Sequence, residues 1–375
     1  MWKNSICEYK YKVGNRLSMA VWRKRVVLRM LCMAFSAMLM SGCSESEPSI
    51  QPQADIPIKV GVSLTDDGTR ATFLQDDNVT HYDINLSAYK EGTSGKSYFK
   101  DAWYTYTAGQ WRSVSESAYE TYVWPRNFAL DFVSYIPRDL ERVQTGVSGV
   151  TYGGESPLLS FDCDLPMYEC RDADVPQSEK NQADLTEFMY AIETGRDAAH
   201  DASSGVTLQY RHPFCKITLW LNKARRCTID EIQIAGVYNK GHFTLSREDR
   251  MADGRGEWVP QGDKNNLMNI AVGKKVPEDI NNNSRLAGPF IMMPQNLTED
   301  AKITVKYTPT PLPGQVGVQE TGEAKIVTEN NLTTKWEPGK EYIYVMTIGN
   351  ADNEIVLSVQ VVDWIYEGTT PVDVE

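Results

Sequence analysis

The chain is poor in histidine and has no metal-binding pattern. Its four histidines are His81, His200, His212 and His242, and no two have the spacing of a zinc-protease helix. His212 precedes a proline where a strand is predicted to begin, and a hydrogen-bonded structural histidine is more common there than a catalytic base. We therefore expect no metal and no cofactor.

Complete motifs for nucleotide binding or covalent catalysis are also absent. Residues 92–97, GTSGKS, resemble a phosphate-binding loop, but Lys90 stands where that motif requires glycine. No Gly-x-Ser-x-Gly elbow is present to hold a nucleophile on a strained turn. The acidic stretches at 162–164 and 172–174 lack the glycine and glutamate of a calcium loop, which favours solvated loops. The protein is predicted not to be an enzyme, with an extracellular hydrolase as a remote alternative because carboxylates are abundant.

The chain has no apolar run long enough to remain in a membrane. Residues 26–40 are apolar apart from Arg29, follow the basic residues 23–25, and end before Ser41, Gly42 and Cys43. A spanning helix needs about 20 apolar residues. The pattern predicts a lipoprotein signal peptide over residues 1–42, with Met19 as a candidate true start. Cys43 would become the lipidated first residue of an outer-membrane lipoprotein carrying palmitate or similar acyl chains.

Basic charge is scarce once this segment is removed. The chain carries a net charge of −12 from 38 basic and 50 acidic side chains. Cleavage after residue 42 would remove eight basic groups and one acidic group, which leaves a net charge near −19. Nucleic-acid binding requires a basic surface, so we exclude nucleic acid as a partner.

Few cysteines remain after cleavage. Cys43 is assigned to lipid, and the others are Cys163, Cys170, Cys215 and Cys227. An exported protein folds where disulfides form, and Cys163 and Cys170 flank a proline that could bring them together. We consider this bridge a candidate disulfide. Cys215 falls on the apolar face of a predicted strand, where a buried thiol is the simpler interpretation.

Helical periodicity is rare, and the dominant period is two. Residues 44–55 are polar and form a predicted tether. Beyond them, apolar residues alternate as in strands, and Gly, Pro, Asn and Asp clusters separate the alternating stretches. Residues 183–192 read either as a short helix or as a loop followed by a strand. The predicted strands are 56–64, 82–90, 103–106, 129–135, 206–210, 215–221, 231–237, 303–307, 342–348 and 355–364.

This pattern predicts a mainly β protein with two tandem β-sandwich domains and few short helices. The predicted N-terminal domain covers residues 56–203 and the C-terminal domain residues 204–375. The boundary is placed in the polar segment 194–205.

Aromatic residues cluster around one turn. Trp103, Tyr104, Tyr106 and Trp111 surround a Gly-Gln pair. Trp103 and Trp111 are candidate glycan contacts, because exposed aromatic rings stack on sugars. Alternation within a hairpin core explains the cluster equally well.

Short motifs occur in an ordered series along the chain. They are TRA (69–71), NFALDFVSYIP (127–137), DLTEFMYA (184–191), HPFCKI (212–217), GPFIMMPQ (288–295), WEPGKEY (336–342) and VVDW (361–364). Each motif alone is weak, but their order and spacing are specific. The series resembles the fimbrillin-like (Mfa-like) family, which includes type V pilus subunits of Bacteroidales.

The resemblance implies two sandwiches of transthyretin-like, Greek-key type. It also implies a pilus subunit, or an accessory or anchor component, that mediates adhesion. In pilin members a protease cuts after an arginine and removes the first strand, and the open groove accepts a strand from the next subunit. Arg70 and Ala71 match that cleavage position. The alternative for Arg70 is a solvated loop arginine in an uncleaved subunit.

The donated strand in this family can come from the C-terminal end. The candidate donor residues are Ile355, Leu357, Val359 and Val361, which form one apolar face. The alternative is an ordinary last strand of the C-terminal domain. Expected partners are other pilus subunits, the outer membrane through the lipid, and a host or bacterial surface glycan or protein. The competing function is a surface lipoprotein that binds glycans and does not polymerise.

Overall fold

In the computed structural model, every described residue lies in one compact unit, Asp55–Glu375. No helix among these residues is long and apolar enough to span a membrane. The described residues are 55–64, 79–92, 96–114, 121–153, 158–169, 182, 185–224, 226–246, 256–264, 268–276, 284–327, 333–349 and 355–364.

The fold is built almost entirely from strands, as predicted. All the strands predicted above are present, most with adjusted ends. The segment 183–192 leads into a strand rather than a helix. The regular helical elements described are short: η1 (Val79–His81) and α2 (Ala198–Asp201).

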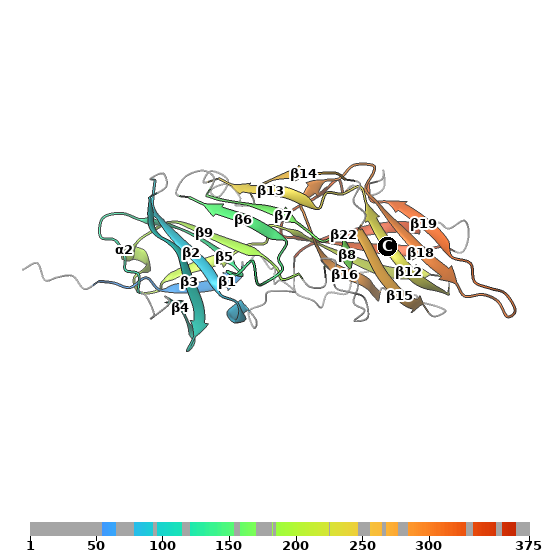
Figure 1. Cartoon of the computed structure of the whole chain (residues 1–375), viewed down its shortest axis with the longest axis horizontal. Helices are drawn as coiled ribbons and strands as arrows, with labels where there is room; N and C mark the ends of the chain where they lie inside the picture. Colours follow the sequence, from blue (N-terminus) through green and yellow to red (C-terminus); the bar gives the residue numbers. More distant parts are fainter. Residues whose placement is uncertain are drawn as a thin grey trace, which may run out of the picture. The chain divides into compact units, whose positions relative to one another are not determined.

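The N-terminal part centres on a five-stranded antiparallel sheet with the order β4-β3-β2-β5-β9 (Figure 1). A parallel pair of strands, β1 (Val60–Leu64) and β10 (Val206–Tyr210), shares one apolar core with this sheet. The strands of the sheet are β2 (Ile84–Lys90), β3 (Ser97–Thr107), β4 (Gln110–Val114), β5 (Leu130–Ile136) and β9 (Met189–Arg196).

Both faces of this sheet are covered at β2 and β5. Leu130 and Phe132 belong to the core shared with β1 and β10, whereas Val133 and Tyr135 belong to a second core. This second core includes residues of a four-stranded sheet ordered β14-β13-β7-β6. The strands of that sheet are β6 (Val147–Tyr152), β7 (Leu159–Asp164), β13 (Lys240–Leu245) and β14 (Glu257–Gln261).

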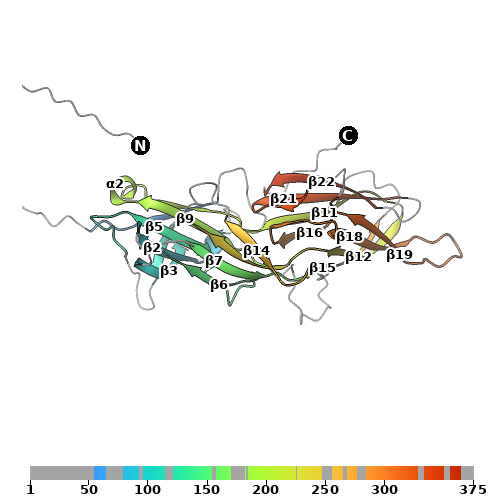
Figure 2. The same cartoon turned by 90° about the horizontal axis from the view of Figure 1, so that it is seen from above.

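The C-terminal part is a sandwich of two sheets, seen as two layers in Figure 2. One sheet has the order β16-β11-β21-β22, and the other has the order β19-β18-β12-β15-β8. A third core, rich in Ile, Leu and aromatic residues, fills the space between them. The strands are β8 (Tyr168–Glu169), β11 (Cys215–Ala224), β12 (Cys227–Ala235), β15 (Met268–Val276), β16 (Ser284–Met292), β18 (Lys302–Pro309), β19 (Glu320–Lys325), β21 (Lys340–Ile348) and β22 (Ile355–Asp363). A small pair, β17 (Gln295–Asn296) and β20 (Lys335–Trp336), lies beside it.

Strand pairing joins segments on either side of residue 203. β1 pairs with β10, and β7 pairs with β13 along six residues from Lys240↔Asp164 to Leu245↔Leu159. The division into domains at 203/204 stays a prediction.

Candidate assembly site

The first described segment is held between two partners. Before β1, the amide of Ile58 donates to the carbonyl of Tyr122 at 2.8 Å, and the amide of Trp124 donates to the carbonyl of Ile56 at 2.8 Å. The chain then runs parallel to β10, from Val60↔Val206 to Leu64↔Tyr210. Residues 56–64 therefore supply hydrogen bonds to two neighbouring segments at once.

One face of this segment is apolar and buried. Ile58, Val60 and Leu64 are buried, and Val62 packs partly against the same core. Leu208 and Tyr210 of β10 and Trp111 of β4 belong to that core too. Because side chains alternate along a strand, Ile58, Val60, Val62 and Leu64 share one face. Loss of this segment would uncover a groove with apolar walls and an unpaired edge on β10.

Arg70 and Ala71, the candidate cleavage residues, lie outside the described residues, in the stretch that directly follows β1. Cys43, the candidate lipidation residue, also lies outside them. Processing and lipidation stay predictions.

The candidate donor residues lie on β22, which is an edge strand. β22 pairs antiparallel with β21 along nine residues, from Lys340↔Asp363 to Ile348↔Ile355. Ile355 is buried, and Leu357 and Val359 pack partly against the C-terminal core, whereas Val361 is 45% exposed. In this structure β22 therefore completes its own sheet, so its use as a donor would require unpairing it from β21.

The candidate glycan contacts lie on opposite faces of the β3–β4 hairpin. Trp103 is 37% exposed, and the guanidinium carbon of Arg138 lies 4.9 Å from its ring centroid. Trp111 is buried and pairs with Tyr106, whose ring meets it edge-on at 5.5 Å. The two tryptophans do not form one surface.

Cys163 is a free, buried thiol whose Sγ lies 4.0 Å from the carbonyl of Asn239. Burial raises the pKa of Cys163 to about 12. Its candidate partner Cys170 lies outside the described residues, so the bridge stays a prediction. Cys215 is a free thiol in the C-terminal core, where burial raises its pKa well above the usual value.

Several motif residues meet in one buried polar network. The His212 ring stacks on Trp364, with centroids 4.5 Å apart and an angle of 8°, while its Nδ1 contacts the carboxylate of Glu187. Lys216 Nζ lies 2.8 Å from Glu341 Oε2 and 5.5 Å from the centroid of Trp364. These five residues come from four of the sequence motifs, with His212 and Lys216 in the same one, and the sequence did not predict that they meet.

This network is suited to packing rather than catalysis. The side chains of His212 and Glu187 are only 3% and 1% exposed, so no substrate can reach them. Within the described part of the chain, no group of three His, Cys, Asp or Glu side chains could hold a metal ion.

Comparison with known proteins gives a family and a fold. A family model described as Fimbrillin-like matches residues 69–364. A fimbrial protein from Bacteroides vulgatus has a similar structure, with a TM-score of 0.56, 13% sequence identity, and coverage of 82% of this chain and 99% of that chain. A protein from Bacteroides ovatus, described as a candidate cell adhesion protein, gives a TM-score of 0.51 with 17% identity and coverage of 84% and 100%. No curated protein sequence matches the chain.

Proposed function

Because the chain belongs to the Fimbrillin-like family, a family of structural rather than catalytic proteins, we propose that it is a cell-surface fimbrial subunit that assembles by strand donation. The observation that carries this proposal is the placement of residues 56–64. They form the first described segment, which completes an apolar core and is followed directly by an arginine-containing stretch.

Cleavage after Arg70 would remove β1 together with the preceding residues. Burying one aliphatic side chain contributes about 1.5–3 kcal/mol, so Ile58, Val60 and Leu64 together contribute roughly 5–9 kcal/mol. The amides and carbonyls of β10 that face β1 would also lose their partners. The processed subunit would therefore bind strongly to an extended segment that restores both contributions, which is the physical basis of β-augmentation.

The candidate donor has the apolar spacing that this groove requires. Ile58, Val60, Val62 and Leu64 occur at every second position, as do Ile355, Leu357, Val359 and Val361. A donor in the same orientation could thus place one aliphatic side chain at each vacated position. Its release from β21 would break the pairing of nine residues, and this cost must be offset by the groove.

The test is the variant Arg70→Ala, with Arg126→Ala as the matched control. Arg126 has a side chain that is 60% exposed, and its Nη2 lies 3.9 Å from a carboxylate oxygen of the exposed Asp55. A solvent-exposed ion pair contributes little to stability, so Arg126→Ala should leave the fold unchanged. In the native host, the parent and the control should yield chains beginning at Ala71 in detergent-resistant polymers. Arg70→Ala should yield chains that retain β1 and do not enter polymers. Polymers of normal length from Arg70→Ala would refute strand donation after this cleavage.

Anchoring in the outer membrane through Cys43 forms part of the same proposal. Support comes from the basic, apolar and small-residue series that ends at Cys43. Cys43→Ser should abolish incorporation of labelled palmitate and release the protein from the membrane fraction. If labelled lipid is still incorporated, the assignment of Cys43 is wrong. A subunit that keeps its lipid and its β1 strand would act as an anchor or accessory subunit rather than as part of the shaft.

The glycan-binding alternative has less support from the geometry. Trp111 is buried in the core, and Arg138 lies over the ring of Trp103. A sugar that stacks on this face of Trp103 would have to displace the guanidinium. Saturable oligosaccharide binding that is lost in Trp103→Ala would favour this alternative.

A further inference from the structure

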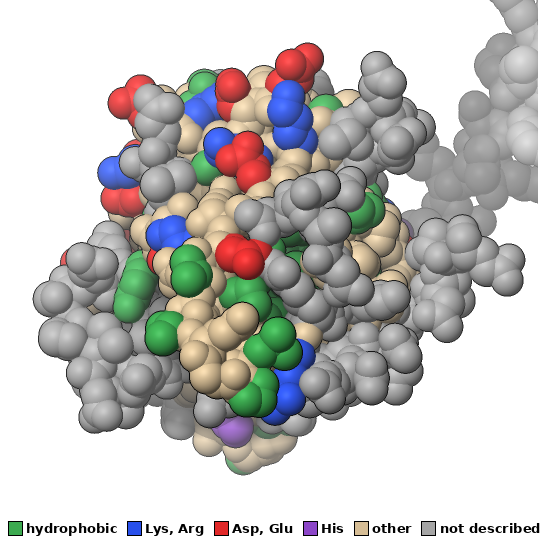
Figure 3. All heavy atoms as spheres, turned by 90° about the vertical axis from the view of Figure 1, so that its right-hand side faces the viewer, with side chains coloured by type: hydrophobic (Ala, Val, Ile, Leu, Met, Phe, Trp, Pro, Cys, Tyr) green, Lys and Arg blue, Asp and Glu red, His purple; other side chains and the backbone are tan. Residues whose placement is uncertain are grey.

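The loop between β18 and β19 forms an apolar, uncharged tip. No charged side chain occurs from residue 307 to residue 319, in a chain that is 23% charged. Leu312, Val316 and Val318 are 68%, 88% and 72% exposed, the largest values among the exposed large hydrophobic residues described. The loop extends to the right in Figure 1, and Figure 3 views this end, where hydrophobic side chains reach the surface. We call residues 307–319 the tip.

The tip is preorganised for binding. Its prolines occur at every second position, 309, 311 and 313, which favours an extended polyproline II backbone. A turn closes its end, where the amide of Gln315 donates to the carbonyl of Leu312 at 2.9 Å and Gly314 has a φ of 87°. At its base, Thr308 and Gln319 both donate to the carboxylate of Asp230, at 2.8 and 3.0 Å. Little conformational entropy remains to be lost when such a loop binds.

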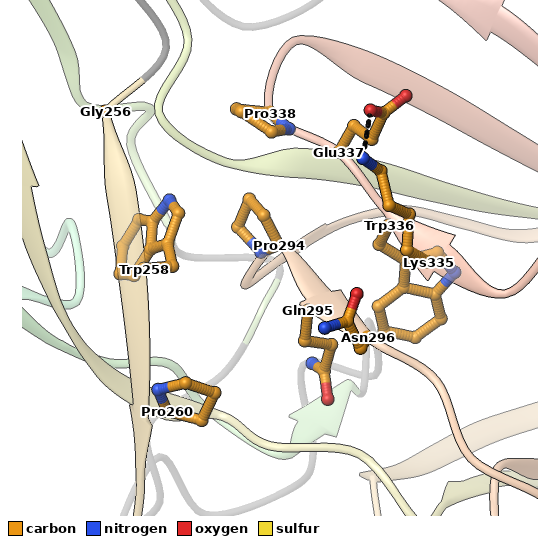
Figure 4. Close-up of a pocket in the computed structure, with 10 residues that line it drawn as sticks. All are labelled: Gly256, Trp258, Pro260, Pro294, Gln295, Asn296, Lys335, Trp336, Glu337 and Pro338. Carbon is orange, nitrogen blue, oxygen red and sulfur yellow. Dashed lines mark ion pairs between the residues drawn. The ribbon is translucent and has the colours of Figure 1, made fainter. Parts of the chain in front are cut away.

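A pocket elsewhere on the same chain is lined by tryptophan and proline. It has a volume of about 330 Å³ and lies between β14 on one side and β17 and β20 on the other. Figure 4 shows Pro294 and Pro338 between Trp258 and Trp336. The other residues that line the pocket are Gly256, Pro260, Gln295, Asn296, Lys335 and Glu337.

The walls of this pocket are held in place from behind. The indole nitrogen of Trp258 donates to the carbonyl of Pro213 at 2.9 Å, and its ring packs on Phe243 at 5.2 Å. The indole nitrogen of Trp336 donates to Tyr344 Oη at 2.9 Å. Trp336 and Pro294 are themselves buried, so Trp258, Pro260 and Pro338 supply the ring surface that a partner can contact. The charges at the rim cancel, because Lys335 and Glu337 form an ion pair at 2.7 Å.

The tip and the pocket match in chemistry. Aromatic-lined grooves bind proline-rich extended segments, because the rings of proline and of tryptophan pack flat on one another. The tip has no charged side chain, so its entry into the pocket removes no charged group of the tip from water. The two charged residues that line the pocket neutralise each other. The amide of Asn296 at the mouth offers a hydrogen-bond donor for a backbone carbonyl of the tip.

The tip cannot reach the pocket of its own chain. Asn296 of the pocket comes shortly before β18, and the eight residues of that strand lead away to the tip. At about 3.3 Å per residue, the strand alone separates them by about 26 Å. We propose that the tip of one copy docks into the tryptophan and proline pocket of a second copy. Because the two surfaces differ, the contact repeats head to tail and produces an open chain of subunits.

The proposal adds a second subunit contact to the proposed fimbrial role and is tested apart from strand donation. The test uses residues 55–375, which form one compact unit and retain β1, so that the groove stays filled. A synthetic peptide with the sequence of residues 307–319 should bind this protein saturably in calorimetry. Leu312→Asp in the peptide should weaken binding about ten-fold or more, because it brings an unpaired carboxylate against aromatic and proline rings.

The decisive experiment is a mixing test by sedimentation velocity. Leu312→Asp removes the tip contact, and Asn296→Arg at the mouth fills the pocket. Each variant alone should remain monomeric at concentrations where the parent associates, but an equal mixture should form dimers that grow no further. Val356→Asp, at a 54% exposed position on β22, is the control that should associate like the parent.

Three results would overturn the proposal. They are a peptide that does not bind, a parent chain that stays monomeric at high concentration, and association that persists in both variants. Binding of the tip peptide to phosphatidylcholine vesicles, without binding to the protein, would assign the tip to a lipid surface instead.

Discussion

The buried pair Lys216–Glu341 yields an asymmetric prediction for stability. The side chain of Lys216 is 2% exposed and that of Glu341 is 13% exposed, with Nζ and Oε2 2.8 Å apart. Thr218 also donates to Glu341 Oε1 at 2.6 Å. Removing one charge of a buried pair costs far more than replacing both with apolar groups, because the remaining charge keeps its desolvation cost without its counterion.

We expect Glu341→Leu to lower the free energy of unfolding by about 3–5 kcal/mol, since the buried ammonium of Lys216 loses its carboxylate. Lys216→Met should cost less, about 1–3 kcal/mol, because Glu341 keeps the hydrogen bond from Thr218 and some contact with water. The double variant should lie within about 1 kcal/mol of the parent, or above it. The predicted coupling energy between the two positions is therefore at least about 3 kcal/mol.

Urea denaturation of residues 55–375, followed by tryptophan fluorescence, measures all four proteins of this cycle. Unchanged m values would show that each variant unfolds from a similar native state. A double variant as unstable as Glu341→Leu would contradict the reasoning. That result would show that Lys216 and Glu341 stabilise the fold through packing and not through each other.

Two further predictions concern the backbone and alkaline pH. Gly236 has a φ of 74°, and a Cβ there would lie 2.2 Å from the carbonyl oxygen of Asp300. Gly236→Ala should therefore lower the free energy of unfolding, measured by urea denaturation, by more than about 3 kcal/mol. Gly262→Ala, with a φ of 75° and open space around it, should cost only about 1–2 kcal/mol, and an equal loss at both sites would disprove the steric argument. Burial raises the pKa of Cys163 from 9.0 to about 12, so the folded state favours the neutral thiol. The contribution of this thiol to the free energy of unfolding is complete below pH 9 and is lost as the pH rises toward 12. The free energy of unfolding should fall by about 2 kcal/mol between pH 9 and pH 10.5 because of Cys163. If the loss comes from this thiol, it should be smaller in Cys163→Ala.

Local pattern was enough to predict the class of fold and the family. Alternation located the strands because one residue in two faces a core, and the Fimbrillin-like match over residues 69–364 confirms the resemblance found from the motifs. Alternation of apolar and polar residues was least informative about strands whose two faces are both buried. In β5, Leu130 and Phe132 face one core while Val133 and Tyr135 face another, so the apolar run is continuous.

Long-range contacts could not be predicted from one sequence. Gln182 bonds both the amide and the carbonyl of Ile291, which is 109 positions away, and nothing near either residue indicates the other. The pocket and the pairing of β7 with β13 depend on the same kind of contact. The candidate donor and cleavage residues come only from the resemblance and stay predictions, because an edge strand and an inner strand have the same period of two.

The three cores differ in their dependence on the first strand, and this difference fits a subunit that is opened by cleavage. Ile58, Val60 and Leu64 belong to the core between β1, β10 and the five-stranded sheet. The second core begins in sequence at Tyr89, and the buried residues of the third begin at Cys215, so neither contains a residue that cleavage after Arg70 would remove. Loss of β1 would therefore weaken one core and leave the C-terminal sandwich and its polar network intact. Under the proposed strand donation, the remaining two cores would keep the processed subunit folded while its groove waits for a donor strand.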